Sequence, residues 1–140
     1  MLSDKTLYNY FCYAGKLCVE NMKKTKQESV NDLTNANQLD VALQVSNVYD
    51  LIIQNVTSIF DKAGLIICQK DAYDVLVKEL IDYKFALEKY KEDEDINVFV
   101  KFSYVILAGI LNNFIIEIIE FKTFSKDVIE ECGLSFLIEE

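Results

Sequence analysis

The sequence predicts an all-α domain, and three observations lead to that prediction. The chain of 140 residues contains no proline and only four glycines. Sandwiches and barrels need many tight turns built on Gly and Pro, so their scarcity favours long helices with few loops. Apolar residues make up 51% of the chain, and many recur at spacings of three and four, the period of a helix buried on one face. We therefore expect a single domain over residues 1–140 with a full hydrophobic core.

The first helix is expected at about residues 4–22. Its apolar face has spacings of four, three and four and consists of Leu7, Phe11, Ala14 and Cys18. Ser3 or Asp4 can cap its first turn. Residues 23–37 are polar and show no apolar period, which favours a loop.

A long second helix is expected at about residues 39–62. Its stripe consists of Val41, Val45, Val48, Ile52, Val56 and Ile59. Gly64 follows where a left-handed residue commonly ends a helix. Residues 65–68 form a short apolar run that alone could be a strand; because no partner strand is evident, a helical turn is favoured.

The next helix, at about residues 73–90, carries two apolar stripes. One stripe consists of Leu76, Leu80, Tyr83, Leu87 and Tyr90, and the other of Val77, Ile81 and Phe85. Either one stripe faces the core and the other offers a binding surface, or both are core, which periodicity alone favours. The charged residues 91–95 end this helix, and their acidic side chains suit the start of the next one.

Residues 98–121 form the most hydrophobic stretch of the chain. Its centre, residues 104–111, is apolar on every side, so a transmembrane helix is the rival interpretation. A clean apolar span is interrupted by Lys101, by the pair Asn112 and Asn113, and by Glu117 and Glu120. We therefore expect a central helix wrapped by others, with Gly109 allowing a neighbouring helix to approach closely.

The last helix is expected from about residue 125 to the end. The residues expected to face the core are Val128, Ile129, Cys132, Phe136 and Leu137. We find no internal repeat and no second domain.

Charge and cysteine content narrow the functional classes. The net charge is −9, without arginine or histidine, so binding to nucleic-acid phosphates is not expected. The four cysteines, Cys12, Cys18, Cys68 and Cys132, allow two disulfides. Each lies in an apolar, helix-like context, however, which favours reduced, buried thiols in an intracellular protein.

Catalysis is not expected. The lack of histidine excludes a Ser-His-Asp triad and a Cys-His pair, and neither a CxxC motif nor a glycine-rich phosphate loop is present. Glu117 and Glu120 have the spacing of carboxylate ligands in bundles, but those sites also need a histidine. We expect no enzyme, no metal and no cofactor, which leaves protein binding, for example through a groove that accepts a partner helix.

The order of elements has a parallel in a known family. It runs from an amphipathic helix and a polar loop to an acidic break and a very apolar helix. Four short segments carry the likeness: Leu-Gln-Val-Ser-Asn at 43–47, Phe-Ala-Leu at 85–87, Val-Phe-Val-Lys-Phe at 98–102 and Phe-Ser-Lys-Asp-Val-Ile at 124–129. The chain resembles the Bcl-2 fold, and within it the poxvirus Bcl-2-like apoptosis inhibitors of myxoma, sheeppox, deerpox and tanapox viruses.

This resemblance implies a Bcl-2-like helical bundle with a central hydrophobic helix and an anti-apoptotic function. The protein would sequester pro-apoptotic Bcl-2 proteins of the Bim, Bax or Bak type by binding their amphipathic Bcl-2 homology 3 (BH3) helix in a hydrophobic groove. The implied groove residues are Val48, Ile52, Val56 and Phe60 in one wall, Leu76, Leu80, Tyr83 and Leu87 in the other, and Val98 and Phe102 at the floor.

Two other functions remain open. Some poxvirus Bcl-2-like proteins have closed grooves and inhibit innate immune (NF-κB) signalling through their outer surface. A structural bundle that assembles with itself is the second.

The chain departs from the family in one motif. Cellular members begin the central helix with Asn-Trp-Gly-Arg, whose arginine pairs with an aspartate of the bound helix. Asn97 and Val98 occupy the Gly and Arg positions here. Lys101 or Lys84 is expected to supply the cation, without the bidentate geometry of arginine.

The family also implies a cellular location. Members usually end in a hydrophobic membrane anchor, which this sequence does not reach by Glu140. A truncated chain is favoured over a naturally soluble form, and the full-length protein is expected in the host cytoplasm and at the mitochondrial outer membrane. A flexible loop at residues 23–37 would permit a domain-swapped homodimer.

Overall fold

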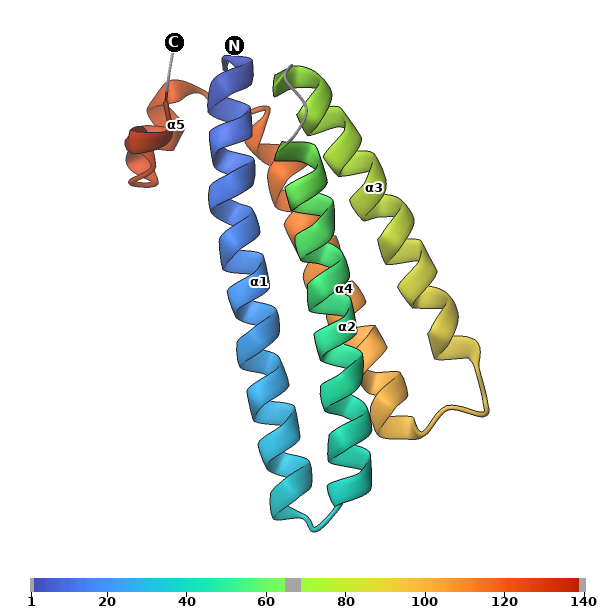
Figure 1. Cartoon of the computed structure of the whole chain (residues 1–140). Coiled ribbons are helices and arrows are strands. Elements are labelled where there is room, and N and C mark those ends of the chain that lie inside the picture. Colours follow the sequence, from blue (N-terminus) through green and yellow to red (C-terminus); the bar gives the residue numbers. More distant parts are fainter. Residues whose placement is uncertain (1, 65–68, 139–140) are drawn as a thin grey trace.

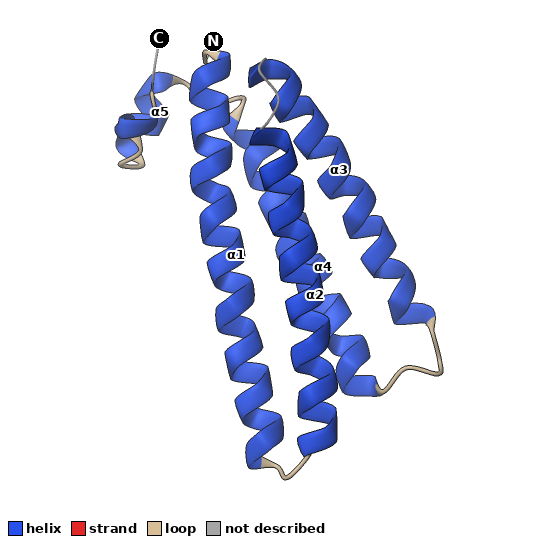
Figure 2. Ribbon diagram, viewed as in Figure 1, coloured by secondary structure: helices blue, strands red, loops and turns tan. Residues whose placement is uncertain are grey.

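The computed structural model describes residues 2–64 and 69–138. Four long helices alternate in direction: α1 (Asp4–Asn35), α2 (Leu39–Gly64), α3 (Gln69–Lys89) and α4 (Val98–Phe121) (Figure 1). Three shorter elements complete the chain: η1 (Tyr90–Glu92), α5 (Lys126–Glu131) and η2 (Ser135–Leu137). The described residues contain helices and loops but no strand (Figure 2), so the all-α prediction is confirmed.

The first helix is longer than predicted, and the loop expected at residues 23–37 is wrong. α1 continues to Asn35 because its second half still packs against α2. Met22 is fully buried and Leu33 is 7% exposed. The polar residues between them are mostly Lys, Gln and Glu, which are good helix formers.

A tight turn, rather than a long loop, joins the first two helices. α1 ends at Asn35 and α2 begins at Leu39. Asn37 has a φ of 60°, a left-handed conformation that asparagine tolerates better than most residues. The flexible 23–37 loop that was expected to permit a domain-swapped homodimer is therefore helix and a tight turn instead.

The predicted apolar faces of the first helices form the core. All four predicted α1 core residues are buried. Phe11 lies at the centre, with ring centroids 5.4 Å from Phe60, 6.1 Å from Tyr73 and 5.5 Å from Phe114. These edge-on contacts join side chains from all four long helices.

The close approach of two helices occurs at a different glycine from the one predicted. A Cβ added to Gly15 would lie 2.8 Å from the Phe60 ring, so α1 and α2 meet there without room for a side chain. A Cβ on Gly109 would meet nothing within 4 Å. The expectation that Gly109 lets a neighbouring helix of the bundle approach is therefore wrong.

α4 has the predicted bounds but is not wrapped on all sides. Its inner face is buried, with Leu107, Leu111 and Ile118 inaccessible to solvent, whereas its outer face exposes large apolar side chains. Contrary to expectation, α4 has the length and composition of a membrane-spanning helix, with a mean hydropathy of 1.8 over an 18-residue window that is 39% buried. Such a value is also found for core helices of bundles.

The last predicted helix is shorter than expected. α5 stops at Glu131, and Gly133, with a φ of 77°, turns the chain into η2. Of the five residues expected to face the core, Ile129 and Leu137 are buried. Val128, Cys132 and Phe136 are exposed. For Phe136 the reason is that the chain leaves the helical path at Gly133.

Two contacts hold this C-terminal segment against α1. The Asn9 side-chain amide donates a hydrogen bond to the Leu137 carbonyl at 3.3 Å, and the Phe136 ring packs edge-on against Tyr13 at 5.4 Å. α5 consequently lies beside the start of α1 (Figure 1).

The observed bounds of α2 and α3 are close to the predicted ones. α2 matches residues 39–62 with two further residues, and α3 begins four residues earlier than expected and ends at Lys89. α2 ends at Gly64, the glycine that was expected to mark its end. The helical turn predicted for residues 65–68 lies outside the described residues.

Candidate functional site

The outer face of α4 exposes a run of apolar residues. Val98, Phe99 and Phe102 are 53%, 45% and 57% exposed, and Val105 and Ile106 are 47% and 40% exposed. With Gly109, which is also exposed, they recur at spacings of one, three and four and therefore share one side of the helix. We call these six residues the α4 apolar face. Scattered exposed apolar residues are ordinary, but a contiguous patch marks a binding surface.

A hollow of about 330 Å³ borders this face on the side of α1 and α2. Leu33 and Val45 lie at its base, beside Phe99 and Phe102 of α4. Its volume exceeds that of a large apolar side chain, so a residue of a bound partner can enter it.

Ser29 and Ser103 also line this hollow. The buried Tyr49 hydroxyl is close to both serines, and burial raises its pKa while these neighbours lower it. No contact of the Tyr49 hydroxyl with a described residue has the geometry of a hydrogen bond. The Tyr49 ring therefore stabilises the core by apolar packing, while its hydroxyl contributes little hydrogen-bond energy.

A second hollow of about 220 Å³ borders the face on the side of α3, where Lys84 and Glu88 face Val105 and Gly109. The Lys84 ammonium donates a hydrogen bond to the Asn112 Oδ1 atom at 3.0 Å and lies 3.8 Å from Glu88. Lys84, one of the two predicted cations, is thus engaged within the protein, beside the apolar face.

Lys101, the other predicted cation, is half-buried near the start of α4. Its single ammonium can meet one carboxylate oxygen of a partner, whereas arginine would meet two. The structure thus brings both predicted cations to the helix that carries the apolar face.

The predicted groove residues fall into three groups. Those in the core are at most 2% exposed: Ile52, Val56, Leu76, Leu80 and Leu87. Those that are half-buried and pack against the core are Val48, Phe60 and Tyr83. Val98 and Phe102 are exposed.

The two predicted groove walls, α2 and α3, pack against each other. The Asn55 side-chain amide also donates a hydrogen bond to the Tyr83 hydroxyl at 3.1 Å between them. Ile52, Val56 and Leu80 are at most 1% exposed, so a partner helix could reach them only if the helices of the bundle moved apart. Partner binding by the predicted groove residues stays a prediction, and the exposed Val98 and Phe102 are the residues most accessible to a partner.

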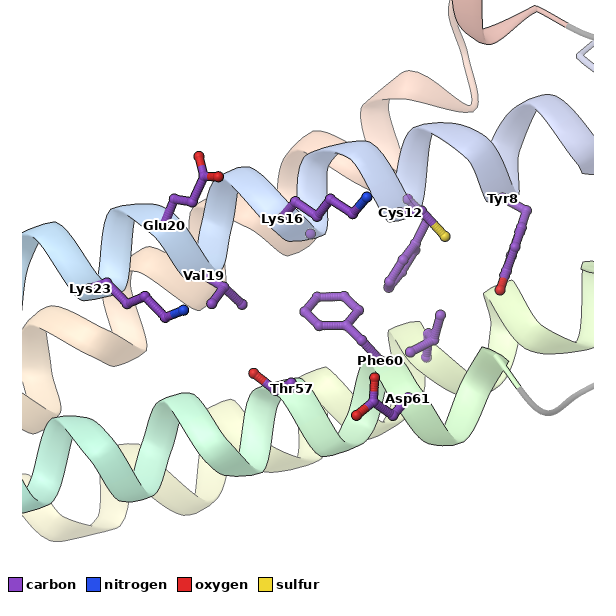
Figure 3. Close-up of a pocket in the computed structure, with 12 residues that line it drawn as sticks. Tyr8, Cys12, Lys16, Val19, Glu20, Lys23, Thr57, Phe60 and Asp61 are labelled. Carbon is purple, nitrogen blue, oxygen red and sulfur yellow. The ribbon is translucent and has the colours of Figure 1, made fainter.

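A separate cleft of about 420 Å³ lies between α1 and α2. Figure 3 shows the Phe60 ring in its middle, with Lys23 and Asp61 directed toward the gap and Glu20 directed away from it. Phe11 and Leu76 supply an apolar base. Because its rim carries charges of both signs, the cleft has no evident preference for a charged ligand.

The described cysteines are free thiols, but only one is buried. Cys18 is buried, whereas Cys12 and Cys132 are exposed, contrary to the prediction of buried thiols, and Cys68 lies outside the described residues. Burial, aided by Glu117, raises the pKa of the Cys18 thiol to about 12. A thiol with so high a pKa is a poor nucleophile at neutral pH.

No group of His, Cys, Asp or Glu side chains suited to hold a metal ion occurs among residues 2–64 and 69–138. The spacing of Glu117 and Glu120 therefore has no third ligand beside it in this part of the chain. Both carboxylates are exposed on α4, as expected of solvated residues near a helix end.

Sequence reasoning identified only part of the α4 apolar face. Phe99, Val105 and Ile106 were not among the predicted site residues. For Val105 and Ile106 the available signal is the apolar character of residues 104–111 on every side, which exceeds what one core can cover; Phe99 lies before that segment. Comparisons with protein-family models, curated proteins and solved structures found no match for this chain.

Proposed function

We propose that this protein acts by binding another protein, and that the α4 apolar face receives an amphipathic helix of the partner. One observation carries the proposal: five large apolar side chains on consecutive turns of α4 are 40–57% exposed. Covering apolar surface contributes about 25 cal/mol per Å², so this face offers a strong driving force for association.

The dimensions of the face suit a helix. Residues 98–109 span about three turns, roughly 17 Å at 1.5 Å per residue. A partner helix with apolar anchors at positions i, i+3 or i+4, and i+7 matches that length. The hollows on either side of α4 provide space for side chains that flank the anchors.

Gly109 also supports a helix partner at this face, because a glycine within a helix lowers its stability. Glycine within a helix destabilises it by roughly 0.5–1 kcal/mol relative to alanine, and a Cβ built at Gly109 meets no atom of another described helix within 4 Å. The bundle itself gains no close packing from this glycine. A partner helix that lies on the face would pack closely against Gly109.

The resemblance to poxvirus Bcl-2-like inhibitors gives the proposal a specific form. The bound helix is then the BH3 helix of a pro-apoptotic protein of the Bim, Bax or Bak type, and binding prevents cell death by sequestration. Val98 and Phe102 belong both to the implied groove and to the α4 apolar face. In this form the protein has no catalytic role.

Calorimetric titration with a Bim-derived BH3 peptide tests the specific form. We expect saturable binding, and no binding of a peptide whose conserved Leu and Asp are replaced. Phe102→Asp should abolish binding, whereas Leu51→Asp should not, because Leu51 is similarly exposed, at 54%, but lies on α2. Binding unaffected by Phe102→Asp would refute the assignment to the α4 face.

The burial of Ile52, Val56 and Leu80 supports a second candidate function. A bundle whose predicted groove is closed suits an inhibitor of innate immune signalling that acts through its outer surface. This candidate predicts no heat with the BH3 peptide from folded, helical protein. It also predicts inhibition of an NF-κB reporter in cells that Phe102→Asp removes and Leu51→Asp preserves.

A further inference from the structure

We infer that the α4 apolar face selects a basic amphipathic helix, one that carries Lys or Arg on both sides of its apolar anchors. This inference rests on the proposed function, because it specifies the chemistry of the helix that the face receives. It is carried by the distribution of charge around the face.

Acidic side chains lie on both hollows that border the face and in the segment that precedes α4. In that segment four consecutive exposed residues are acidic, Glu92, Asp93, Glu94 and Asp95, and Ile96 and Asn97 separate them from Val98. Asp32 lies on the hollow that Phe99 and Phe102 border, and Glu88 lies on the opposite hollow.

Lysines near the face balance only part of this charge. Lys84 is already engaged with Asn112 and Glu88, Lys101 lies on α4 itself, and Lys89 and Lys91 precede the acidic run in the sequence. The two hollows and residues 92–95 together contribute six carboxylates and the ammonium group of Lys84, so acidic groups outnumber basic ones around the face. Lys or Arg beside the anchors of a partner would meet opposite charge at both hollows and at the start of α4.

The same charge argues against two other occupants. A second copy of the chain would bring another net charge of −9 and another acidic cluster to the interface, and like charges placed opposite each other oppose association. An anionic membrane surface would be repelled in the same way, since it attracts basic rather than acidic segments.

Two designed helical peptides of about 16 residues test the inference. They share the same leucine anchors at i, i+3 or i+4, and i+7; one carries Lys at the flanking positions and the other carries Glu. By fluorescence anisotropy at low salt we expect the basic peptide to bind at least tenfold more tightly. Because exposed charges are screened as salt rises, the difference should shrink at high salt.

A matched pair of variants separates local charge from net charge. Glu94→Lys changes the charge beside the face, and Glu20→Lys makes the same change on the rim of the α1–α2 cleft. We expect Glu94→Lys to weaken binding of the basic peptide several-fold more than Glu20→Lys does. Equal effects would overturn the inference, because they would reflect only the overall charge of the chain.

Further outcomes distinguish this inference from the proposed function. If both peptides bind equally and Phe102→Asp abolishes binding, the face receives a helix but does not select its charge, and the inference is overturned alone. If neither peptide binds, the proposed function fails with it. A concentration-dependent dimer in sedimentation, or binding to anionic vesicles that Phe102→Asp removes, would identify one of the other occupants and overturn the inference.

Discussion

The same substitution at two glycines should have opposite effects on stability. Gly109→Ala places a methyl group on an exposed part of α4 with nothing within 4 Å. Alanine is favoured over glycine within a helix by roughly 0.5–1 kcal/mol. We expect the free energy of unfolding to rise by about that amount.

Gly15→Ala should lower stability despite the same gain in helix propensity. Its Cβ would lie 2.8, 2.9 and 3.3 Å from three atoms of the Phe60 ring. That ring packs edge-on against Phe11 and Phe114, at 5.4 and 5.7 Å, so moving it disturbs the core. Overpacking costs about 1–3 kcal/mol, which leaves a net loss of about 0–2.5 kcal/mol after the propensity gain.

Urea unfolding followed by circular dichroism at 222 nm measures both changes. The two variants should differ by about 1–3 kcal/mol with equal denaturant dependence. In a Phe60→Leu background, which removes the opposing ring, Gly15→Ala should cost less. If Gly15→Ala stabilises the protein as much as Gly109→Ala does, the close contact between α1 and α2 is wrong.

Three further predictions follow from burial. Leu80→Ala should lower the free energy of unfolding by about 2–5 kcal/mol, because Leu80 is fully buried; a loss below about 1 kcal/mol in urea unfolding would show that α2 and α3 are open there. Tyr49→Phe should leave stability unchanged or raise it by up to about 1 kcal/mol, since the buried hydroxyl lacks a hydrogen bond to any described residue; a large loss in the same assay would reveal a partner. At pH 8 a thiol reagent followed by mass spectrometry should label Cys12 but not Cys18 until the protein unfolds. Burial raises the pKa of the Cys18 thiol from 9.0 to about 12, so the unfolded chain loses this proton at a lower pH than the folded protein does. The contribution of the Cys18 thiol to stability should therefore hold below about pH 9 and decline as the pH rises toward 12. A flat profile in alkaline urea titrations, or early labelling of Cys18, would contradict its burial.

Much of the fold could be predicted because the apolar period is strong where helices pack in the core. The bounds of α4, Val98–Phe121, match the prediction, and α2 differs by two residues. The second half of α1 could not be predicted in the same way. Between Met22 and Leu33 only one partly buried apolar residue, Val30, packs against the core, which is too sparse a pattern to show a period.

The candidate site was harder to predict than the helices. A helix that is apolar on every side does not indicate which of its faces the neighbouring helices will cover. Phe102 was expected to contact a partner and is exposed, whereas Leu80 was expected to do so and is core. Both carry the same apolar character in the sequence, and only the packing of α2 against α3 separates them.

The short connection at Asn37 also has a consequence for how the chain folds as it is synthesised. α1 and α2 form an antiparallel hairpin of neighbouring elements, and α3 and α4 form another. Contacts between neighbouring elements close short loops, which favours rapid folding. Because the N-terminal hairpin leaves the ribosome first, α4, the most apolar helix, emerges when its packing surface already exists. The order of the helices thus limits the time during which both faces of α4 are in contact with water.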